Sequence, residues 1–452
     1  MTVKDLLIIG DGFSAAVALI HLLRQGVDPT FIAILGKHFP GRGNAYDCVS
    51  SAFRLNVRED LPIIFSEDPL HFARWAKEHI NDPQAKTSAG YFYRRNDFGT
   101  YMSQLVNHQL GGRTMNHIEG VAQQISGSDG QWRIELKSGE SINAKALILA
   151  TGNATPTWPC PVHLDQTSSH LTLTENPWPG EYLRQIPIKD HVLLLGGGLT
   201  ALDAINGLVE QGHQGQVSVI SPRALFPPSQ APWTRAKQPQ WPQSITPARL
   251  VRFMRNYLPN TPTDQSEWQC AWEELRPDLN RIWQNLDVHQ RCILMKRVGW
   301  LWNLYRFRAS PQTIAAYHQL RNQKQIQFRC GRAKEIAIRS GAIHVTLNHG
   351  EVVSGQHLIN CTGVARDLLL DQLIQYAIAS PDALQSSIAV NSQLAVLDPM
   401  GQPYQSLWMI GPATMGSLGD VIAASAIAKQ AEQLAQAIRL NWIPISHLTT
   451  PS

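Results

Sequence analysis

The fold of this chain is decided by two stretches with one shared pattern, "LLIIGDGFSAAVALIHLL" (6–23) and "LLLGGGLTALDAINGL" (193–208). Each begins with an apolar run typical of a buried strand, passes through a glycine-rich turn and continues with the apolar period of a helix. A further apolar run, at 31–35 in the first case and 217–221 in the second, starts about 20 residues after the glycines, where a βαβ unit places its next strand. The sequence therefore predicts two βαβ units in tandem.

The glycine turns predict that each unit binds a dinucleotide. The first glycine allows the tight turn from strand to helix, the second lets the backbone approach a pyrophosphate, and a small third residue lets helix and strand pack closely. The N–H groups at the helix N-terminus then face the phosphates. The cofactor-binding residues predicted on this basis are Gly10, Gly12, Ser14 and Ala15 in the first turn and Gly196, Gly198 and Thr200 in the second.

A second repeat supports an internal duplication. The segment "RIELKSGESINAKALILATG" (133–152) aligns without a gap to "HVTLNHGEVVSGQHLINCTG" (344–363). Each copy has a strand, a polar turn with one glycine, a second strand and then a Thr-Gly pair. Two unrelated hairpins would not be expected to share this order after a glycine-rich turn. The Thr-Gly pairs, which we expect at the two nucleotide sites, are Thr151, Gly152, Thr362 and Gly363.

Composition limits the classes of protein that this chain can represent. Its 452 residues suffice for two or three domains, and 43% hydrophobic with 16% charged residues is typical of a globular chain. The net charge of +4 is small and no basic run is present, so nucleic-acid binding is not indicated. No uninterrupted apolar run reaches about 18 residues, so no membrane span is predicted.

The six cysteines are scattered and form no Cys-x-x-Cys motif. This spacing indicates a reducing cytoplasm and argues against a zinc ribbon, so no metal site is predicted. It also argues against reductases that exchange disulfides, because they need a close cysteine pair.

The predicted fold class is α/β, with two dinucleotide-binding (Rossmann-like) domains of which the second is inserted into the first. We expect the first domain to comprise residues 1–160 and 356–452 and the second to comprise residues 165–355. The second domain is interrupted by a segment at about 222–310. This segment is rich in proline at its start and then shows a helical pattern.

Seven of the 13 tryptophans lie in this helical insertion, between Trp233 and Trp302. They form either the core of a small helical subdomain or the lining of a substrate pocket. Beyond the insertion, "LWMIG" (407–411) predicts a strand and "GDVIAASAIAKQAEQLAQAIRL" (419–440) predicts a long amphipathic helix. Asp420 would be its N-cap or an acid in its first turn.

Several further motifs fit a known family. They are "GRGNAYDCVSSAFRLNV" (41–57), "YFYRRNDFGTYM" (91–102), "WLWNLYRFRASP" (300–311), "INCTG" (359–363) and "IGPATMGSLGD" (410–420). Together with the glycine turns, they resemble the flavoproteins with two dinucleotide-binding domains. More narrowly, they resemble the FAD/NAD(P)-binding family that includes FAD-dependent urate hydroxylase and the aspartate N-monooxygenases. The likeness runs along nearly the whole chain.

The resemblance implies a function and its cofactors. FAD would be held by the first domain, to which the C-terminal helix returns, and NADPH or NADH by the inserted domain. After hydride transfer, the reduced flavin of such a monooxygenase captures dioxygen as a C4a-hydroperoxide and transfers one oxygen atom to a small nitrogenous substrate, urate-like or an amino acid. The expected partners are thus a small-molecule substrate and dioxygen. Two alternatives stay open, an NAD(P)H:acceptor reductase and a nucleotide-binding sensor or partner protein without turnover.

The chain departs from the family pattern at two places. A unit that binds FAD usually ends its second strand with Glu or Asp, which binds the ribose hydroxyls. Here Gly36 stands at that position and Lys37 follows, so we expect adenosine to be bound differently, with Lys37 as a candidate contact. The acid that usually follows the late "IG" is replaced by Pro412. Gly411 and Asp420 are the cofactor-binding residues predicted in that region.

The choice of coenzyme depends on Arg223. The second strand of the inserted unit is followed by "SPR" (221–223), without an acid and with a guanidinium that can accept a 2′-phosphate. This favours NADPH over NADH. In the other interpretation, Arg223 is a solvated loop residue.

Catalytic candidates come from the motifs of the resemblance. Asn56 is a candidate hydrogen-bond donor near the isoalloxazine, or it stabilises a turn. Tyr46, Arg95 and Arg308 are candidates for the site where the domains meet, or they form structural hydrogen bonds and ion pairs.

Overall fold

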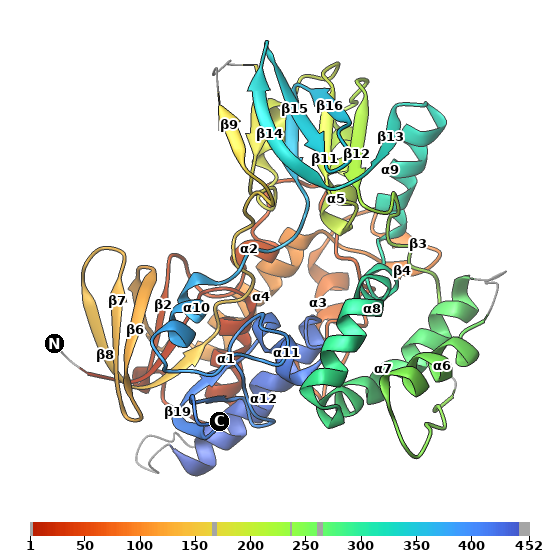
Figure 1. The fold of residues 1–452 in the computed structure, drawn as a ribbon. Coiled ribbons are helices and arrows are strands. Elements are labelled where there is room, and N and C mark those ends of the chain that lie inside the picture. Colours follow the sequence, from red (N-terminus) through yellow and green to blue (C-terminus); the bar gives the residue numbers. More distant parts are fainter. Residues whose placement is uncertain (1–2, 165–169, 236, 260–264, 443–452) are drawn as a thin grey trace.

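The computed structural model describes residues 3–164, 170–235, 237–259 and 265–442. Figure 1 shows the two ends of the chain sharing one body, with the middle of the chain forming a second body above it and a group of helices at its side. We refer to these parts as the first unit, the second unit and the helical insertion.

The first unit is built on an eight-stranded sheet. Its main strands follow the order β18-β19-β8-β1-β2-β5 and run parallel from β19 to β5, with β18 antiparallel at the edge. The strands β6 and β7 continue the sheet from the first half of β8. The strands are β1 (Lys4–Ile9), β2 (Ile32–Gly36), β5 (Asn116–Glu119), β6 (Ala122–Ser128), β7 (Gln131–Leu136), β8 (Ser141–Leu149), β18 (Ala395–Leu397) and β19 (Pro403–Met409).

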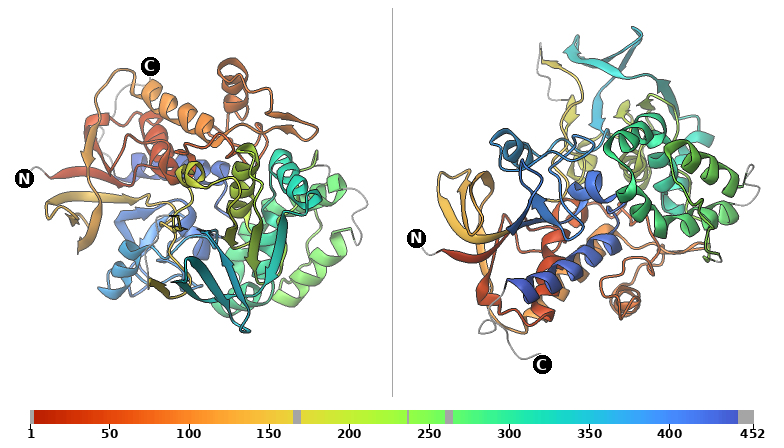
Figure 2. Two further views of the ribbon diagram at one scale, coloured as in Figure 1. Left: turned by 90° about the horizontal axis from the view of Figure 1, so that it is seen from above. Right: turned by 60° about the horizontal axis from the view of Figure 1, so that its bottom comes forward.

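Helices from both ends of the chain cover this sheet. The helix α1 (Phe13–Arg24) packs against α4 (Arg95–Leu110) and against α12 (Ala424–Asn441), and the right view of Figure 2 shows α12 lying along the first unit. All of α1 from Phe13 to Leu23 is buried, which is why its sequence is apolar almost throughout. The C-terminal segment therefore completes the core that the N-terminal segment begins.

The second unit repeats this plan with a five-stranded parallel sheet in the order β10-β17-β11-β12-β13. The helices α5 and α9 pack against each other beside it, and a second sheet follows the order β16-β15-β14-β9. The elements are β9 (Val162–Leu164), β10 (Thr172–Thr174), β11 (Val192–Leu195), α5 (Leu199–Glu210), β12 (Val217–Ser221), α9 (Pro311–Asn322), β13 (Ile326–Cys330), β14 (Ala333–Arg339), β15 (Ala342–Leu347), β16 (Val352–Gly355) and β17 (His357–Asn360).

These two units confirm the predicted fold class. The runs expected as second strands of the βαβ units are β2 and β12, each parallel to the strand that precedes its glycine turn. The exact domain boundaries stay a prediction, with residues 1–160 and 356–452 in the first domain and residues 165–355 in the second. The strand pairing shows which residues near these boundaries belong to the sheets of the second unit. β9 pairs with β14 and β17 pairs with β11, so strands of the second unit extend from Val162 to Asn360.

The duplication is visible in the contacts of the first glycine of each turn. Gly10 has a φ of +123°, and a Cβ there would lie 2.3 Å from the carbonyl oxygen of Ala150. Gly196 has a φ of +118°, and a Cβ there would lie 2.3 Å from the carbonyl oxygen of Cys361. In both units, therefore, the backbone of the residue before the Thr-Gly pair lies so close to the first glycine of the turn that a side chain on this glycine would clash with it.

The helical insertion comprises α6 (Pro247–Tyr257), α7 (Gln265–Asn285) and α8 (Val288–Arg306). The structure places its tryptophans in two different settings, and a role in binding substrate stays a prediction. Trp268 and Trp272 are buried and contact the ring of Tyr305, so they belong to the interior of the insertion, beside a cavity of about 710 Å³. Trp233 and Trp300 instead line the larger cavity between the units.

The start of the C-terminal helix corrects one prediction. We expected a helix at 419–440 with Asp420 in its first turn, but α12 begins at Ala424 with Ala423 as its N-cap. The preceding α11 (Met415–Leu418) ends at Gly419, whose φ of +97° breaks the helical path. Asp420 is instead drawn into ion pairs with Arg306 and Arg276 of the helical insertion.

Smaller elements complete the chain. They are η1 (Pro29–Phe31), α2 (Gly43–Tyr46), α3 (His71–His79), β3 (Lys86–Thr87), β4 (Gly90–Tyr91), η2 (Glu181–Gln185), α10 (Leu368–Gln375) and η3 (Pro412–Thr414). Among the residues that the structure describes, no helix combines the length and apolarity needed to cross a membrane.

The glycine contacts generate a test of the fold. We expect Gly196→Ala to lower the free energy of unfolding by about 3 kcal/mol, because its Cβ would meet the backbone of Cys361 in a conformation that disfavours side chains. Gly198→Ala is the matched control, since nothing lies within 4 Å of its Cβ. Thermal and denaturant unfolding of both variants measure the difference, and an equal loss in the two would contradict the assigned contact.

Candidate functional site

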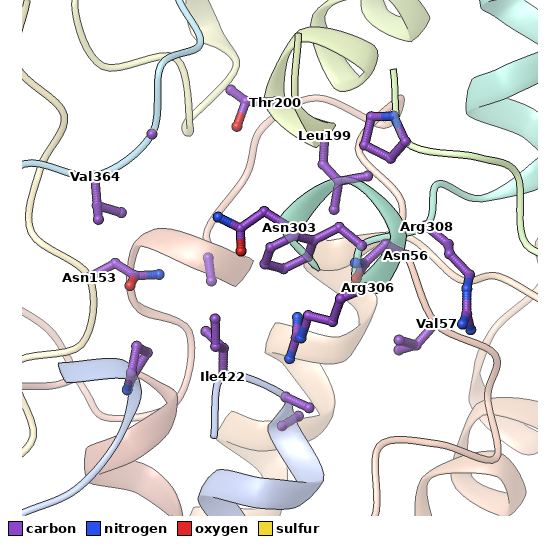
Figure 3. A pocket seen from close by; sticks show the side chains of 18 of the residues that line it. Asn56, Val57, Asn153, Leu199, Thr200, Asn303, Arg306, Arg308, Val364 and Ile422 are labelled. Carbon is purple, nitrogen blue, oxygen red and sulfur yellow. The ribbon is translucent and has the colours of Figure 1, made fainter. Parts of the chain in front are cut away.

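A cavity of about 1390 Å³ lies where the two units and the helical insertion meet. Figure 3 shows how side chains from distant segments reach it. Asn56 and Val57 come from a loop of the first unit, Leu199 and Thr200 from the start of α5, and Ile422 from the segment before α12. Asn303, Arg306 and Arg308 come from the end of α8 and the residues after it.

Most of the predicted site residues line this one cavity. They are Gly10, Gly12, Ser14, Tyr46, Asn56, Arg95, Thr151, Gly152, Gly196, Gly198, Thr200, Arg223, Arg308, Thr362, Gly363 and Asp420. Three do not line it. Ala15 is fully buried beneath the turn, Lys37 is exposed, and Gly411 packs against Ser14 while its N–H donates to Gln430. The structure brings the group together, and the individual roles stay predictions.

The first glycine turn leaves its backbone open to the cavity. Gly12 has ordinary extended angles, and the nearest atom to a Cβ placed on it would be the Cα of Gly43, at 3.5 Å. Gly43 itself has a φ of +53°, and its own Cβ would meet the Cα of Gly12 at 2.6 Å. The two glycines thus let two backbone segments approach one edge of the cavity without side chains between them.

The N-terminus of α12 also lines the cavity. Ala423, Ala424 and Ser425 all line it, and the N-cap residue Ala423 offers no side-chain acceptor to the first N–H groups. The positive end of this long helix and its uncapped N–H groups are therefore available to a ligand with partial negative charge.

The second glycine turn is equally open, because nothing lies within 4 Å of a Cβ placed on Gly198. At the end of β12, the guanidinium of Arg223 lies over the ring of Trp300, with 4.1 Å between Cζ and the ring centroid. Trp300 belongs to α8, so the helical insertion contributes directly to the position of Arg223.

Arg332 is a second cation on this side that sequence reasoning missed. The N–H of Gly331 donates to the carbonyl oxygen of Ser221, which brings the residue after β13 beside the end of β12. Arg332 lines the cavity, as Arg223 does. The position of Arg332 at the cavity depends on the pairing of β13 with β12, and no local sequence pattern indicates this pairing.

The loop that carries Asn56 is fixed from both sides. The buried Arg54 donates from Nη1 to Asp82 Oδ2 and to the carbonyl oxygen of Phe92, both at 2.8 Å. The side-chain amide of Gln230 donates to the carbonyl oxygen of Asn56 at 2.9 Å. The backbone of Asn56 is thereby held in place, and its side chain lies at the cavity (Figure 3).

Tyr46 packs against aromatic neighbours at the cavity edge. Its ring centroid lies 4.8 Å from that of Phe98 and 5.8 Å from that of Phe13. Burial raises the pKa of the Tyr46 hydroxyl to about 12, so the group is neutral and able to donate a hydrogen bond at physiological pH.

Arg95 makes the contacts of a structural ion pair. Its Nη2 lies 2.6 Å from Oδ2 of Asp203 on α5, and its Nε donates to the carbonyl oxygen of Arg54. The pair joins the first unit to the second. Burial raises the pKa of Asp203 to about 6, although the charge of Arg95 acts in the opposite direction.

A buried group of charges forms one wall of the cavity. Arg308, with 3% of its side chain exposed, donates from Nη1 to Oε1 of Glu273 at 2.7 Å, and Arg306 lies 2.5 Å from Asp420. Arg276 bridges the two carboxylates, at 3.1 Å from Glu273 and 3.3 Å from Asp420. Three guanidinium groups against two carboxylates leave one net positive charge in this cluster.

One polar atom of this wall has no internal partner. The Nε of Arg308 is buried and makes no hydrogen bond with the residues that the structure describes. Since Arg308 lines the cavity, a ligand acceptor can take this donor. Glu273, Arg276 and Arg306 were not among the predicted site residues. The Glu273–Arg276 spacing indicates only an ion pair within a helix, and nothing in the sequence connects it to Asp420.

Comparison with known proteins agrees with this architecture. Residues 7–154 match the family model described as FAD-NAD(P)-binding. No curated protein sequence matches the chain.

Three solved structures share the fold over nearly the whole chain. The ornithine N-hydroxylase of Kutzneria sp. 744, described with reduced FAD, NADP+ and L-ornithine, has a TM-score of 0.65 at 12% identity and covers 97% of this chain and 99% of its own. The reduced ornithine hydroxylase of Pseudomonas aeruginosa has a TM-score of 0.64 at 15% identity, covering 97% and 100%.

The third structure is the FAD-bound cadaverine monooxygenase of Erwinia amylovora, with a TM-score of 0.64 at 14% identity, covering 100% of this chain and 98% of its own. At these identities the likeness concerns the fold alone. The segment matched by the family model contains the first glycine turn, and the match is consistent with the flavoprotein likeness that the sequence motifs predicted.

Proposed function

We propose that this protein is an FAD-dependent NAD(P)H monooxygenase that hydroxylates a small nitrogenous substrate. The observation that carries the proposal is that both glycine turns open on one cavity. Two separate nucleotide clefts would keep a hydride donor and a flavin apart, whereas a shared cavity lets their reactive rings meet. The fold shared with an ornithine N-hydroxylase and a cadaverine monooxygenase supports this choice among flavoprotein activities.

The residues of the first unit fit FAD. The open backbone at Gly12 and the N-terminus of α1 would take the pyrophosphate, and the uncapped start of α12 would face the polar edge of the flavin ring. When bound, FAD supplies the redox chemistry, accepting hydride and reacting with dioxygen. The protein's part is to hold the rings in place and to keep water away from them.

The residues of the second unit fit a nicotinamide coenzyme. Gly198 leaves room for its pyrophosphate at the start of α5, and Arg223 with Arg332 would hold a 2′-phosphate at the end of β12. We therefore propose NADPH rather than NADH as the donor. The stacking of Arg223 on Trp300 holds the guanidinium in place before the coenzyme arrives.

The remaining wall fits a small polar substrate. The unpaired Nε of Arg308 and the net positive charge around it favour a carboxylate or another electron-rich acceptor, as found on an amino acid or on urate. The Asn56 side chain and the neutral Tyr46 hydroxyl would supply further hydrogen bonds. None of the six cysteines, all of which lie in the described ranges, forms a disulfide, and this supports a reducing compartment such as the cytoplasm rather than disulfide exchange.

A turnover assay tests the proposal. Purified protein should carry FAD, and NADPH oxidation should rise together with oxygen consumption when the correct substrate is added from a set of urate, aspartate and small amines. An acceptor reductase would oxidise NADPH equally without a hydroxylated product. A nucleotide-binding sensor would show no turnover under any condition.

The two glycine turns should fail in different ways. Gly12→Val places a branched side chain where the pyrophosphate approaches, so the variant should purify folded and without FAD. Gly198→Val should keep its FAD but lose reduction by NADPH, while dithionite still reduces it. Flavin absorbance and circular dichroism report both results. Retention of FAD in the first variant, or normal reduction in the second, would contradict the two-site assignment.

Arg223 should determine the coenzyme preference. Arg223→Ala should raise the KM for NADPH by about tenfold, as expected for the loss of one charge-assisted contact, with little change for NADH. Arg321→Ala removes one positive charge from an exposed position on α9 and serves as the control. Equal weakening of both coenzymes, or a wild-type preference for NADH, would show that Arg223 does not contact the phosphate.

A further inference from the structure

The first glycine turn holds an acidic residue between its two glycines. The side chain of Asp11 extends towards the end of β2, and a Cβ placed on Gly36 would lie 2.4 Å from Asp11 Cβ and 2.9 Å from its Oδ2. The Asp11 side chain thus occupies the space in which a side chain at position 36 would begin. In the sequence, Gly36 stands where an acidic residue is usually found. In the structure, the absence of a side chain at Gly36 leaves room for the side chain of Asp11.

Asp11 is fixed in this position by the backbone around it. Its Oδ2 accepts a hydrogen bond from the N–H of His38 at 2.8 Å, and its carbonyl oxygen accepts one from the N–H of Gly41 at 3.0 Å. Its other carboxylate oxygen, Oδ1, makes no hydrogen bond with the described residues. Asp11 lines the cavity beside Gly10 and Gly12. A carboxylate is therefore present at the end of the second strand after all, although it comes from the turn.

The second unit provides an internal comparison. The residues equivalent to Asp11 and Gly36 are Gly197 and Ser221, and a Cβ on Gly197 would lie 2.9 Å from Ser221 Oγ. Here the strand supplies the side chain and the turn supplies the glycine. In each unit there is room for a side chain either on the turn or at the end of the second strand, but not on both. In the first unit the side chain is on the turn, at Asp11.

We propose that Asp11 binds the ribose hydroxyls of the adenosine half of FAD, in place of the acidic residue that β2 lacks. The inference rests on the proposed function only in that it takes FAD as the ligand of the first unit. A carboxylate at the end of the second strand accepts hydrogen bonds from ribose hydroxyls in such units, and Asp11 puts its oxygens at that end. The glycine at position 36 and the acid at position 11 then form one exchangeable pair.

An exchange of the two residues tests the proposal. Asp11→Gly should raise the dissociation constant of FAD, measured by flavin fluorescence on the apoprotein, by about tenfold or more. Gly36→Glu alone should also weaken FAD binding, because its Cβ meets Asp11. The double variant Asp11→Gly with Gly36→Glu moves the carboxylate to its usual place and should recover most of the lost affinity. FMN, which lacks adenosine, should bind all variants alike.

Controls separate this inference from the proposed function. Asp11→Asn keeps the shape of the side chain and serves if the glycine variant fails to fold. Glu119→Gln alters the carboxylate directly across from Gly36 on β5, which does not line the cavity, and should leave FAD affinity unchanged. Unchanged FAD affinity in both Asp11 variants, or a loss only with Glu119→Gln, would overturn the role of Asp11. A wild-type protein that does not bind FAD would overturn the proposed function instead.

Discussion

Each unit is organised around the close approach of a glycine to a backbone carbonyl oxygen. Gly10 contacts the backbone at Ala150, and Gly196 contacts it at Cys361. Each contact brings the end of a third parallel strand against a strand-to-helix turn, so that the turn, the helix N-terminus and the Thr-Gly pair share one edge of the sheet. Because both units are built in this way, both edges can face the single cavity between them.

Ion pairs join the first unit to the second unit and to the helical insertion. Asp203 on α5 pairs with Arg95 on α4, while Asp420 pairs with Arg306 of the helical insertion. Pairs with so little exposure are costly to break, since a carboxylate left alone would stay buried without its counter-charge. They therefore favour one arrangement of the units around the cavity, and Arg308 adds a donor to its wall.

Local patterns made the fold predictable, and long-range contacts limited the prediction of the site. The apolar runs, the glycine turns and the Thr-Gly pairs each depend on neighbours within one βαβ unit, so β1, β2, β11 and β12 could be predicted. The position of Asp420 outside the C-terminal helix could not be predicted, because its partner Arg306 lies far away in the sequence. The position of Arg332 at the cavity depends on the order of strands in the five-stranded sheet of the second unit, which no local pattern indicates. The departure at Gly36 was visible in the sequence, but its explanation needed the position of Asp11 in space.

An experimental structure of the protein with FAD and NADP+ bound would test directly whether the two cofactors share the cavity. We expect FAD to lie along the first glycine turn and NADP+ along the second, with the nicotinamide and flavin rings in contact inside the shared cavity near the start of α12. A nicotinamide coenzyme bound outside this cavity, or a flavin bound at the second turn, would contradict this expectation.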